Sequence, residues 1–253
     1  GALRMRAPHV GRRELLRELS ARLIDAAAGR GALVELVGEP GVGKSRLLAE
    51  LRAAAAPRDF VFVQGRADET DGDRAFGAFA DLVMDLSGVE AEDAPEVRFA
   101  KVERMRVLGL APHELRRLGE LVGLAYPVSS GVREGRPRGI ELALALRKAV
   151  RALSRDRVVV LALEDLHWMD DATRQVLPLL VRGLERCPVV VLVSRRPGVS
   201  GLAPSDGDVR VIEPLDRGAT AALAAHHLGA RSIEPALGAH VYALTGGIPA
   251  WIA

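Results

Sequence analysis

The sequence predicts an α/β protein built on a doubly wound, mostly parallel sheet of five strands, followed by a small region of helices only. Short apolar runs of strand length alternate with longer segments whose apolar residues recur at helical spacing. The apolar runs are nearly continuous, which is typical of parallel strands covered on both faces. From Leu215 onward the pattern is helical only. Together these features favour strand–helix alternation with ligands at the carboxyl ends of the strands.

The first predicted elements surround a glycine-rich loop. An amphipathic helix spans 12–28 and is followed by a buried strand at 32–37 and a helix at 44–56. A second strand covers 60–64. An insertion at 75–124 comes next, in which helices are predicted at 76–86, 95–108 and 112–124 but no motif indicates a role. Residues 127–138, rich in Gly, Ser, Pro and Arg, are predicted to form a surface loop.

The sheet is predicted to resume after this loop. The remaining elements are helix 140–153, strand 158–163, helix 172–184, strand 188–194 and strand 209–212. We therefore expect three segments: an N-terminal segment with its lead-in helix (1–30), a large α/β domain (31–214) and a partial helical lid (215–253). Because this lid holds only about two helices and the start of a third, we expect the chain to be a fragment of a longer protein.

Composition excludes several classes of protein. Hydrophobic residues make up 49% and charged residues 27%, as in soluble globular proteins, and no apolar run approaches the roughly 18 residues of a membrane helix. With Cys187 as the single cysteine, no disulfide can form within the chain, so a reducing cytoplasm is expected. The net charge is +2 and the arginines are scattered, so neither membrane association nor direct nucleic-acid binding is expected.

The loop after the first strand matches the pattern G-x-x-x-x-G-K-[ST], the Walker A or P-loop motif. Its residues are Gly38-Glu39-Pro40-Gly41-Val42-Gly43-Lys44-Ser45. Glycines let backbone N–H groups turn toward a β-phosphate, which the start of the following helix also attracts. Lys44 would reach the β- and γ-phosphates, and the Ser45 hydroxyl would hold Mg²⁺. A plain glycine turn that caps a helix is the alternative, and the strand–loop–helix context disfavours it.

Two carboxylates, Glu164 and Asp165, follow the most apolar strand. A nucleoside triphosphate site needs a carboxylate for Mg²⁺ and a group that orients the attacking water. Parallel strands deliver such side chains to the same edge as the phosphate loop. The alternative is a polar strand end before a helix, and Asp170 or Asp171 is predicted to cap the helix that follows.

Two arginines, Arg195 and Arg196, follow the fourth strand. One guanidinium could point toward a γ-phosphate from this neighbouring strand end. In an arginine-rich chain, solvated surface side chains are the competing interpretation.

Taken together, these motifs resemble the nucleotide-binding domain of the STAND branch of the AAA+ ATPases, which are signalling P-loop NTPases with numerous domains. The similarity covers almost the whole chain. It resembles most the ATPase segments of large bacterial LuxR-type transcriptional regulators and of signalling proteins with cyclase or kinase modules. The matching phrases are Val10-Gly11-Arg12-Arg13-Glu14, the P-loop extended by Arg46-Leu47-Leu48, Leu163-Glu164-Asp165-Leu166-His167-Trp168-Met169-Asp170, Arg196-Pro197 and Thr245-Gly246-Gly247-Ile248-Pro249.

The resemblance implies ATP or ADP with Mg²⁺ as cofactors, and a role for several residues. Val10 and Arg12 would lie on the adenine side, Arg196 would sense the γ-phosphate, and Pro249 would contact the base from the helical lid. The nucleotide-binding set implied in this way runs from the P-loop through Arg46. The metal would be held by Ser45, Glu164 and Asp165, and the catalytic set would be Lys44, Glu164, Asp165 and Arg196. His167 and Trp168 are expected to pack the sheet edge at least as readily as to touch nucleotide.

The acidic pair departs from the family pattern, in which Asp precedes Asp or Glu. Here Glu164 comes first and Asp165 second. A longer first carboxylate can still reach Mg²⁺ through water, but a shorter second one would lie farther from the attacking water and slow hydrolysis.

Three functions remain open on this basis. The leading hypothesis is an ATP-dependent, slowly hydrolysing switch in a multidomain signalling or transcription regulator, whose lid sits differently with ATP and ADP. The inverted acids favour a non-hydrolysing ADP or ATP scaffold instead. An origin-recognition-type ATPase acting on DNA shares the core fold, but no helix-turn-helix pattern or basic stripe supports it. Expected partners are nucleotide and the other domains of the intact protein, and self-association through the ATPase domain is a further possibility.

Overall fold

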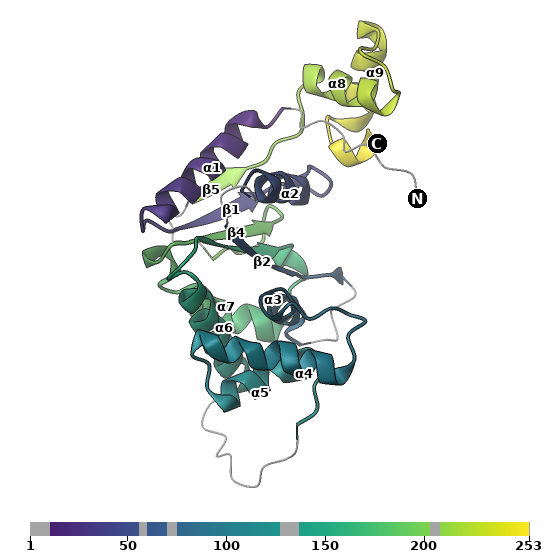
Figure 1. Cartoon of the computed structure of the whole chain (residues 1–253). Helices are drawn as coiled ribbons and strands as arrows, with labels where there is room; N and C mark the ends of the chain where they lie inside the picture. The colour runs from purple at the N-terminus through teal and green to yellow at the C-terminus, as the bar shows by residue number, and fades with distance from the viewer. Residues whose placement is uncertain (1–10, 56–59, 70–74, 127–136, 203–207, 253) are drawn as a thin grey trace.

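The computed structural model describes residues 11–55, 60–69, 75–126, 137–202 and 208–252, and in it five strands form one parallel sheet (Figure 1). The strands lie in the order β2-β3-β4-β1-β5, and all four pairings are parallel. Their bounds are β1 (Ala32–Val37), β2 (Val61–Arg66), β3 (Val159–Glu164), β4 (Val189–Arg195) and β5 (Asp208–Val211). The predicted five-stranded α/β fold is confirmed.

Two helical layers cover the sheet. Helices α1 (Arg13–Ala27) and α2 (Lys44–Ala55) pack on one face, with Val160 and Leu192 of the sheet in their cluster. The opposite face packs against α3 (Gly77–Ser87), α6 (Arg138–Leu153) and α7 (Asp171–Val181). The neighbouring residues Leu161 and Val191 belong to that second cluster, because successive strand residues point to opposite faces. Burial on both faces explains why these strands read as continuous apolar runs.

The insertion begins with α3, which belongs to the second layer, and continues with α4 (Pro95–Arg104), a 3₁₀ turn η3 (Met105–Leu108) and α5 (Pro112–Leu121), which stack beneath that layer in Figure 1. Proline opens both α4 and α5, where its missing N–H costs no hydrogen bond. The predicted helix over 95–108 is therefore an α-helix that tightens into a 3₁₀ turn for its last four residues. Gly109, in the left-handed conformation, ends it.

Helix α7 begins with a side-chain cap. The Asp170 carboxylate accepts a hydrogen bond from the Thr173 backbone N–H at 2.9 Å, so the predicted cap is confirmed for Asp170. The same carboxylate accepts from the Phe76 backbone N–H at 3.1 Å. The start of α3 is thus tied to the segment that follows β3.

The edge strand β2 is covered by carboxylates of α3. The backbone N–H groups of Gln64 and Arg66 donate to Asp85 at 2.9 Å and to Asp81 at 3.1 Å. Asp81 and Asp85 are four residues apart, so they share one side of the helix. This arrangement fixes β2 against α3 and leaves the Gln64 and Arg66 side chains to reach β3.

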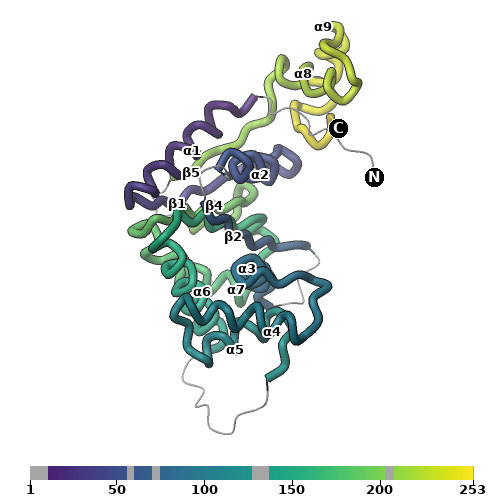
Figure 2. The backbone as a smooth tube through the Cα atoms, viewed as in Figure 1, coloured from purple at the N-terminus to yellow at the C-terminus, as the bar shows by residue number. Residues whose placement is uncertain are grey.

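The C-terminal region is helical and lies beyond the carboxyl ends of the strands, as the backbone trace in Figure 2 shows. It contains α8 (Arg217–His227), α9 (Pro235–Thr245) and the 3₁₀ turn η6 (Pro249–Trp251). The Leu215 N–H donates to the Gly247 carbonyl at 2.8 Å, and a side chain at Gly247 would collide with Leu215. Among the described residues, no helix is long and apolar enough to cross a membrane.

Candidate nucleotide-binding site

The glycine-rich loop connects the end of β1 to the start of α2. Gly41 and Gly43 have φ values of +74° and +102°, a region that favours glycine. The Gly38 N–H donates to the Arg195 carbonyl at 3.2 Å, so the loop begins against the end of β4. Because α2 begins at Lys44, its first backbone N–H groups, which lack partners within the helix, are available to an anion.

Lys44 lies inside the curve of this loop. Its Nζ donates to the carbonyls of Gly38 at 2.7 Å and Glu39 at 3.1 Å, and the side chain is buried. Burial lowers the pKa of Lys44 from its ordinary value, while the Asp165 carboxylate acts in the opposite direction. The ammonium is thus held over the loop by backbone carbonyls and has one donor left for a ligand.

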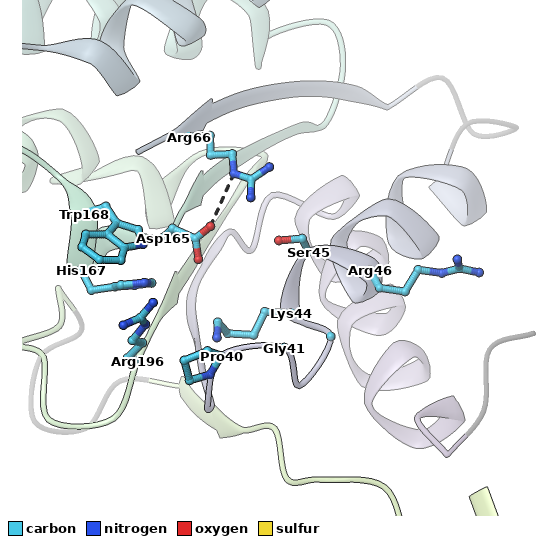
Figure 3. A pocket seen from close by; sticks show the side chains of 11 residues that line it. Pro40, Gly41, Lys44, Ser45, Arg46, Arg66, Asp165, His167, Trp168 and Arg196 are labelled. Atoms are coloured by element: carbon cyan, nitrogen blue, oxygen red, sulfur yellow. Dashed lines mark ion pairs between the residues drawn. The ribbon is translucent and has the colours of Figure 1, made fainter. Parts of the chain in front are cut away.

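A cavity of about 280 Å³ opens between this loop and the ends of three strands (Figure 3). That volume is close to the lower end of small-molecule sites, roughly 300–1,000 Å³. Its lining residues come from the loop, the start of α2 and the ends of β2, β3 and β4: Pro40, Gly41, Gly43, Lys44, Ser45, Arg46, Arg66, Asp165, His167, Trp168 and Arg196. Most are polar or cationic, which suits a phosphate chain.

The two acidic residues take different positions. Glu164 ends β3 and is buried, with Oε1 accepting from the Gln64 side-chain amide. Its Oε2 is buried and has no hydrogen-bond partner among the described residues. Asp165 has a left-handed backbone (φ 58°) and its N–H donates to the Ser194 hydroxyl at 3.0 Å. Asp165 lines the cavity and Glu164 does not.

Asp165 has a basic partner that sequence reasoning missed. The Arg66 Nε lies 3.5 Å from Asp165 Oδ2, and Figure 3 shows the pair across the top of the cavity. The predicted second strand stopped at 64, whereas β2 continues to Arg66. Knowledge of the true strand end would have identified Arg66, because it aligns with Glu164 in the sheet.

Arg195, the last residue of β4, and Arg196, the residue after it, have different surroundings, as Glu164 and Asp165 do. Arg195 forms an ion pair with Glu35 of β1 at 2.7 Å and donates to the Val199 carbonyl. Arg196 lines the cavity, with its guanidinium carbon 4.8 Å from the centre of the Trp168 ring. Arg196 therefore lines the cavity and Arg195 does not, and a contact of Arg196 with the γ-phosphate stays a prediction.

His167 and Trp168 both line the cavity, although they were expected to pack the sheet edge at least as readily. They lie in the 3₁₀ turn η4 (Leu166–Trp168), with ring centres 5.2 Å apart. The His167 Nδ1 is buried and has no hydrogen-bond partner among the described residues. Burial lowers the pKa of His167 below its ordinary value of 6.5, and the Arg196 guanidinium lowers it further.

Arg12 lies next to the loop but outside the cavity lining. Its guanidinium donates to the Val42 carbonyl at 2.7 Å and the Glu213 carbonyl at 2.8 Å, so it ties the loop to the segment after β5. Val42 itself packs in the core below α2. These contacts hold the loop in place, and an adenine contact by Arg12 stays a prediction.

The other implied nucleotide contacts lie at the margins of the site. Arg46 is paired with Glu50 at 2.6 Å, and Figure 3 shows its side chain directed away from Lys44. Pro249 opens η6, whose Ala250 N–H donates to the Gly41 carbonyl at 3.2 Å. Val10 lies outside the described residues. Roles for Val10 and Pro249 at the base stay predictions.

The residues present fit a magnesium ion. The unpaired buried Oε2 of Glu164 is a hard oxygen donor of the kind that Mg²⁺ prefers. The Ser45 hydroxyl points into the cavity in Figure 3, and Asp165 lines the same space. No group of three or more His, Cys, Asp or Glu suited to a metal occurs within the described ranges. Mg²⁺ at nucleotide sites takes few protein ligands, because phosphate oxygens complete its shell.

A Walker-type loop at the end of β1, facing a carboxylate and an arginine from the ends of β3 and β4, is the arrangement of a P-loop nucleotide-binding fold. A family model for the AAA ATPase domain matches residues 8–193, and the chain belongs to this family. As a member it is an ATP-binding module.

One curated protein is similar to this chain in sequence, and one solved structure shares its fold. An uncharacterised protein of Rhizobium meliloti (strain 1021) is 25% identical over 273 residues, covering 98% of this chain and 25% of that protein. The chain thus spans about a quarter of that relative's length. The Walker-type ATPase of Pyrococcus abyssi is similar in structure (TM-score 0.55, 16% identity, 99% of this chain, 68% of that one).

A STAND protein of Pyrococcus horikoshii with a tetratricopeptide repeat sensor was also found, with a TM-score of 0.48 and 16% identity. That match covers 96% of this chain and 29% of the other. Placement of this chain in the STAND branch therefore rests on the sequence phrases rather than on this likeness.

Proposed function

We propose that this chain is a slowly hydrolysing, Mg²⁺-dependent ATP switch in a multidomain signalling or transcription regulator of the STAND type. The observation that carries the proposal is the arrangement of Lys44, Asp165 and Arg196 around one cavity. Lys44 and the loop N–H groups would bind the β-phosphate from one side, and Arg196 would meet the terminal phosphate from the other. The first contact is open to a diphosphate as well, and only the Arg196 contact requires a third phosphate.

Each residue has a definite part in the proposed reaction. Ser45 would hold Mg²⁺ directly and Glu164, which lies outside the cavity lining, would reach it through water; the ion when bound neutralises charge on the β- and γ-phosphate oxygens. Asp165 is the carboxylate that lines the cavity, so it would orient the attacking water and accept its proton. Lys44 and Arg196 would stabilise the negative charge that develops on the transferred phosphoryl group.

Slow hydrolysis is supported by the contacts of Asp165. Its carboxylate is short, and Arg66 Nε lies 3.5 Å away. An ion pair occupies oxygen lone pairs that the attacking water needs, so the carboxylate must leave Arg66 to act as a base. The same contact is what favours the second candidate function, a nucleotide-binding scaffold that does not hydrolyse.

A route from the nucleotide to the helical region supports the switch. Gly41 of the loop accepts a hydrogen bond from Ala250 of η6, and a side chain at Gly41 would come within 2.7 Å of the Ala250 Cβ. A loop that changes conformation around a phosphate would therefore move or release η6. Such a contact gives ATP and ADP a means of holding the helices differently.

Nucleotide binding and turnover by the wild type and Lys44→Ala test the proposal. Loss of a charged hydrogen-bonding group costs about 1.5–3 kcal/mol, which is roughly 10- to 150-fold in affinity for ATP and ADP. Lys148→Ala is the matched control, because Lys148 lies on α6 and pairs with Glu114. A wild type that binds neither nucleotide with Mg²⁺ contradicts the proposal. Binding without any turnover would leave only the scaffold.

A further inference from the structure

The wall opposite the phosphate loop carries an arginine stacked on a tryptophan. Arg196 follows β4 and Trp168 follows β3, and these strands are neighbours in the sheet. The guanidinium carbon lies 4.8 Å from the indole centre, inside the roughly 6 Å limit for a cation–π contact. The half-buried Trp168 also packs against the core on its other side, so the indole gives the arginine a fixed surface.

Arg196 differs from its neighbour Arg195 in its partners. Arg195 is neutralised by the buried Glu35 carboxylate. Within the described ranges, Arg196 has no ion pair with a carboxylate, and its buried Nε has no hydrogen-bond partner. An aromatic face orients a guanidinium without occupying its N–H groups, whereas a carboxylate would compete with an incoming phosphate.

The charges around the cavity favour a terminal phosphate at this wall. Arg196 and Lys44 are both cations that line the same cavity. Figure 3 shows Arg196, His167 and Trp168 together on the side of the cavity that faces Lys44. An anion placed between Lys44 and Arg196 would relieve the repulsion between them.

We propose that Trp168 is the positioning residue that holds Arg196 toward the terminal phosphate, and that this stack lets the site distinguish a nucleoside triphosphate from a diphosphate. The inference rests on the proposed nucleotide-binding function and adds a residue to it. A diphosphate, bound by the loop and Lys44, does not extend to the opposite wall. The Trp168–Arg196 stack therefore acts only when a third phosphate is present.

Substitutions at Trp168 separate positioning from packing. Trp168→Leu keeps apolar bulk but removes the aromatic face, and Trp168→Phe keeps a face. We expect Trp168→Leu to weaken binding of a non-hydrolysable ATP analogue with Mg²⁺ by roughly 3- to 30-fold. ADP affinity stays unchanged, and Trp168→Phe restores most of the loss. Isothermal titration calorimetry with the two nucleotides measures both affinities.

The outcomes separate this inference from the function on which it rests. Equal losses for ADP and the ATP analogue, or a Phe variant as weak as the Leu variant, would mean that Trp168 only packs, and would overturn the inference. ADP binding by the wild type would in that case still support the proposed function. A wild type that binds neither nucleotide would overturn both.

A spectroscopic readout tests the stack directly. The sequence contains two tryptophans, Trp168 and the exposed Trp251, so Trp251→Phe leaves Trp168 as the only indole. We expect the ATP analogue to change the Trp168 emission more than ADP does, because only the triphosphate engages Arg196. Arg196→Gln in the same background should abolish that difference. Identical spectra with the two nucleotides, while both bind, would overturn the inference.

Discussion

The two walls of the cavity are built in opposite ways. The phosphate-loop wall comes from consecutive residues, uses mainly backbone groups, and supplies Lys44 with carbonyl partners. The opposite wall is made of side chains from β2, β3 and β4. Around it lie three buried polar atoms without hydrogen-bond partners in the described part of the chain: Glu164 Oε2, His167 Nδ1 and Arg196 Nε. The phosphate-loop wall offers backbone N–H groups and one Lys44 donor to a ligand, whereas the opposite wall has side-chain atoms that would suit Mg²⁺ and a terminal phosphate.

From this contrast we expect the phosphate-loop wall (the first wall) to bind the nucleotide and the opposite wall (the second wall) to carry out its hydrolysis. Asp165→Asn should therefore have the largest effect on turnover. It removes the carboxylate that would accept the proton of water, and we expect ATP hydrolysis to fall by about 10²- to 10⁴-fold with little change in ADP affinity. A phosphate-release assay beside equilibrium binding measures both. Asp171→Asn, at the first turn of α7, is the control. Unchanged hydrolysis in Asp165→Asn would exclude Asp165 as the base.

A side chain at Gly41 should distort the phosphate loop that forms the first wall. Gly41→Ala places a Cβ at a positive φ and 2.7 Å from the Ala250 Cβ. Gly229 has a similar φ of +67° but nothing within 4 Å of the added atom. Both substitutions cost about 1–2 kcal/mol of backbone strain. We expect only Gly41→Ala to lose nucleotide affinity as well, measured by calorimetry beside thermal unfolding. Equal nucleotide affinity in the two variants would mean that the contact between Gly41 and η6 does not contribute to nucleotide binding.

Arg66→Ala tests whether the ion pair between Arg66 and Asp165 in the second wall limits turnover. Release of Asp165 from an ion pair that is partly exposed is worth at most about 1 kcal/mol, so turnover at saturating ATP should rise by no more than about fivefold. Arg52→Ala is the matched control, since Arg52 lies on α2, outside the cavity lining. A fall in turnover for Arg66→Ala would show that Arg66 assists the reaction.

The smallest expected effect concerns pH. The pKa of His167 is lowered in the folded protein, so the unfolded chain takes up this proton first as pH falls. The protein should lose stability as pH falls below about 6.5 toward the folded pKa, and His167→Gln should remove this contribution. Urea unfolding at pH 7.5 and 5.5 measures the difference, with the exposed His240→Gln as control. A parallel pH dependence in wild type and His167→Gln would contradict the prediction.

The first wall could be predicted from the sequence alone, because the residues that form it are consecutive in the chain. Eight consecutive residues from Gly38 to Ser45 specify the turn, the lysine and the helix start, and the apolar strands specify the sheet. The order of strands, in which β4 lies between β1 and β3, places Arg196 next to the loop. That order follows from packing of the whole chain rather than from any one segment.

The side chains of the second wall could not be placed from the sequence alone. Glu164 and Asp165 are adjacent in sequence, yet the left-handed backbone at Asp165 turns one carboxylate into the cavity while Gln64 holds the other in the interior. Gln64 and Arg66 come from a strand whose end was predicted two residues early. Trp168 gave no local sign of its contact with Arg196, because a tryptophan after a strand packs a core equally well.

The hydrogen bonds from the β2 backbone to the carboxylates of α3 affect how copies of this domain can associate. Asp81 and Asp85 occupy the N–H groups that an extra strand would otherwise pair with. At the other edge, β5 has only four residues and carries charged side chains, Asp208 and Arg210, that are paired with α1. Both edges thus resist strand addition by another chain. Copies of this domain that associate must therefore do so through helix and loop surfaces, without extending the sheet.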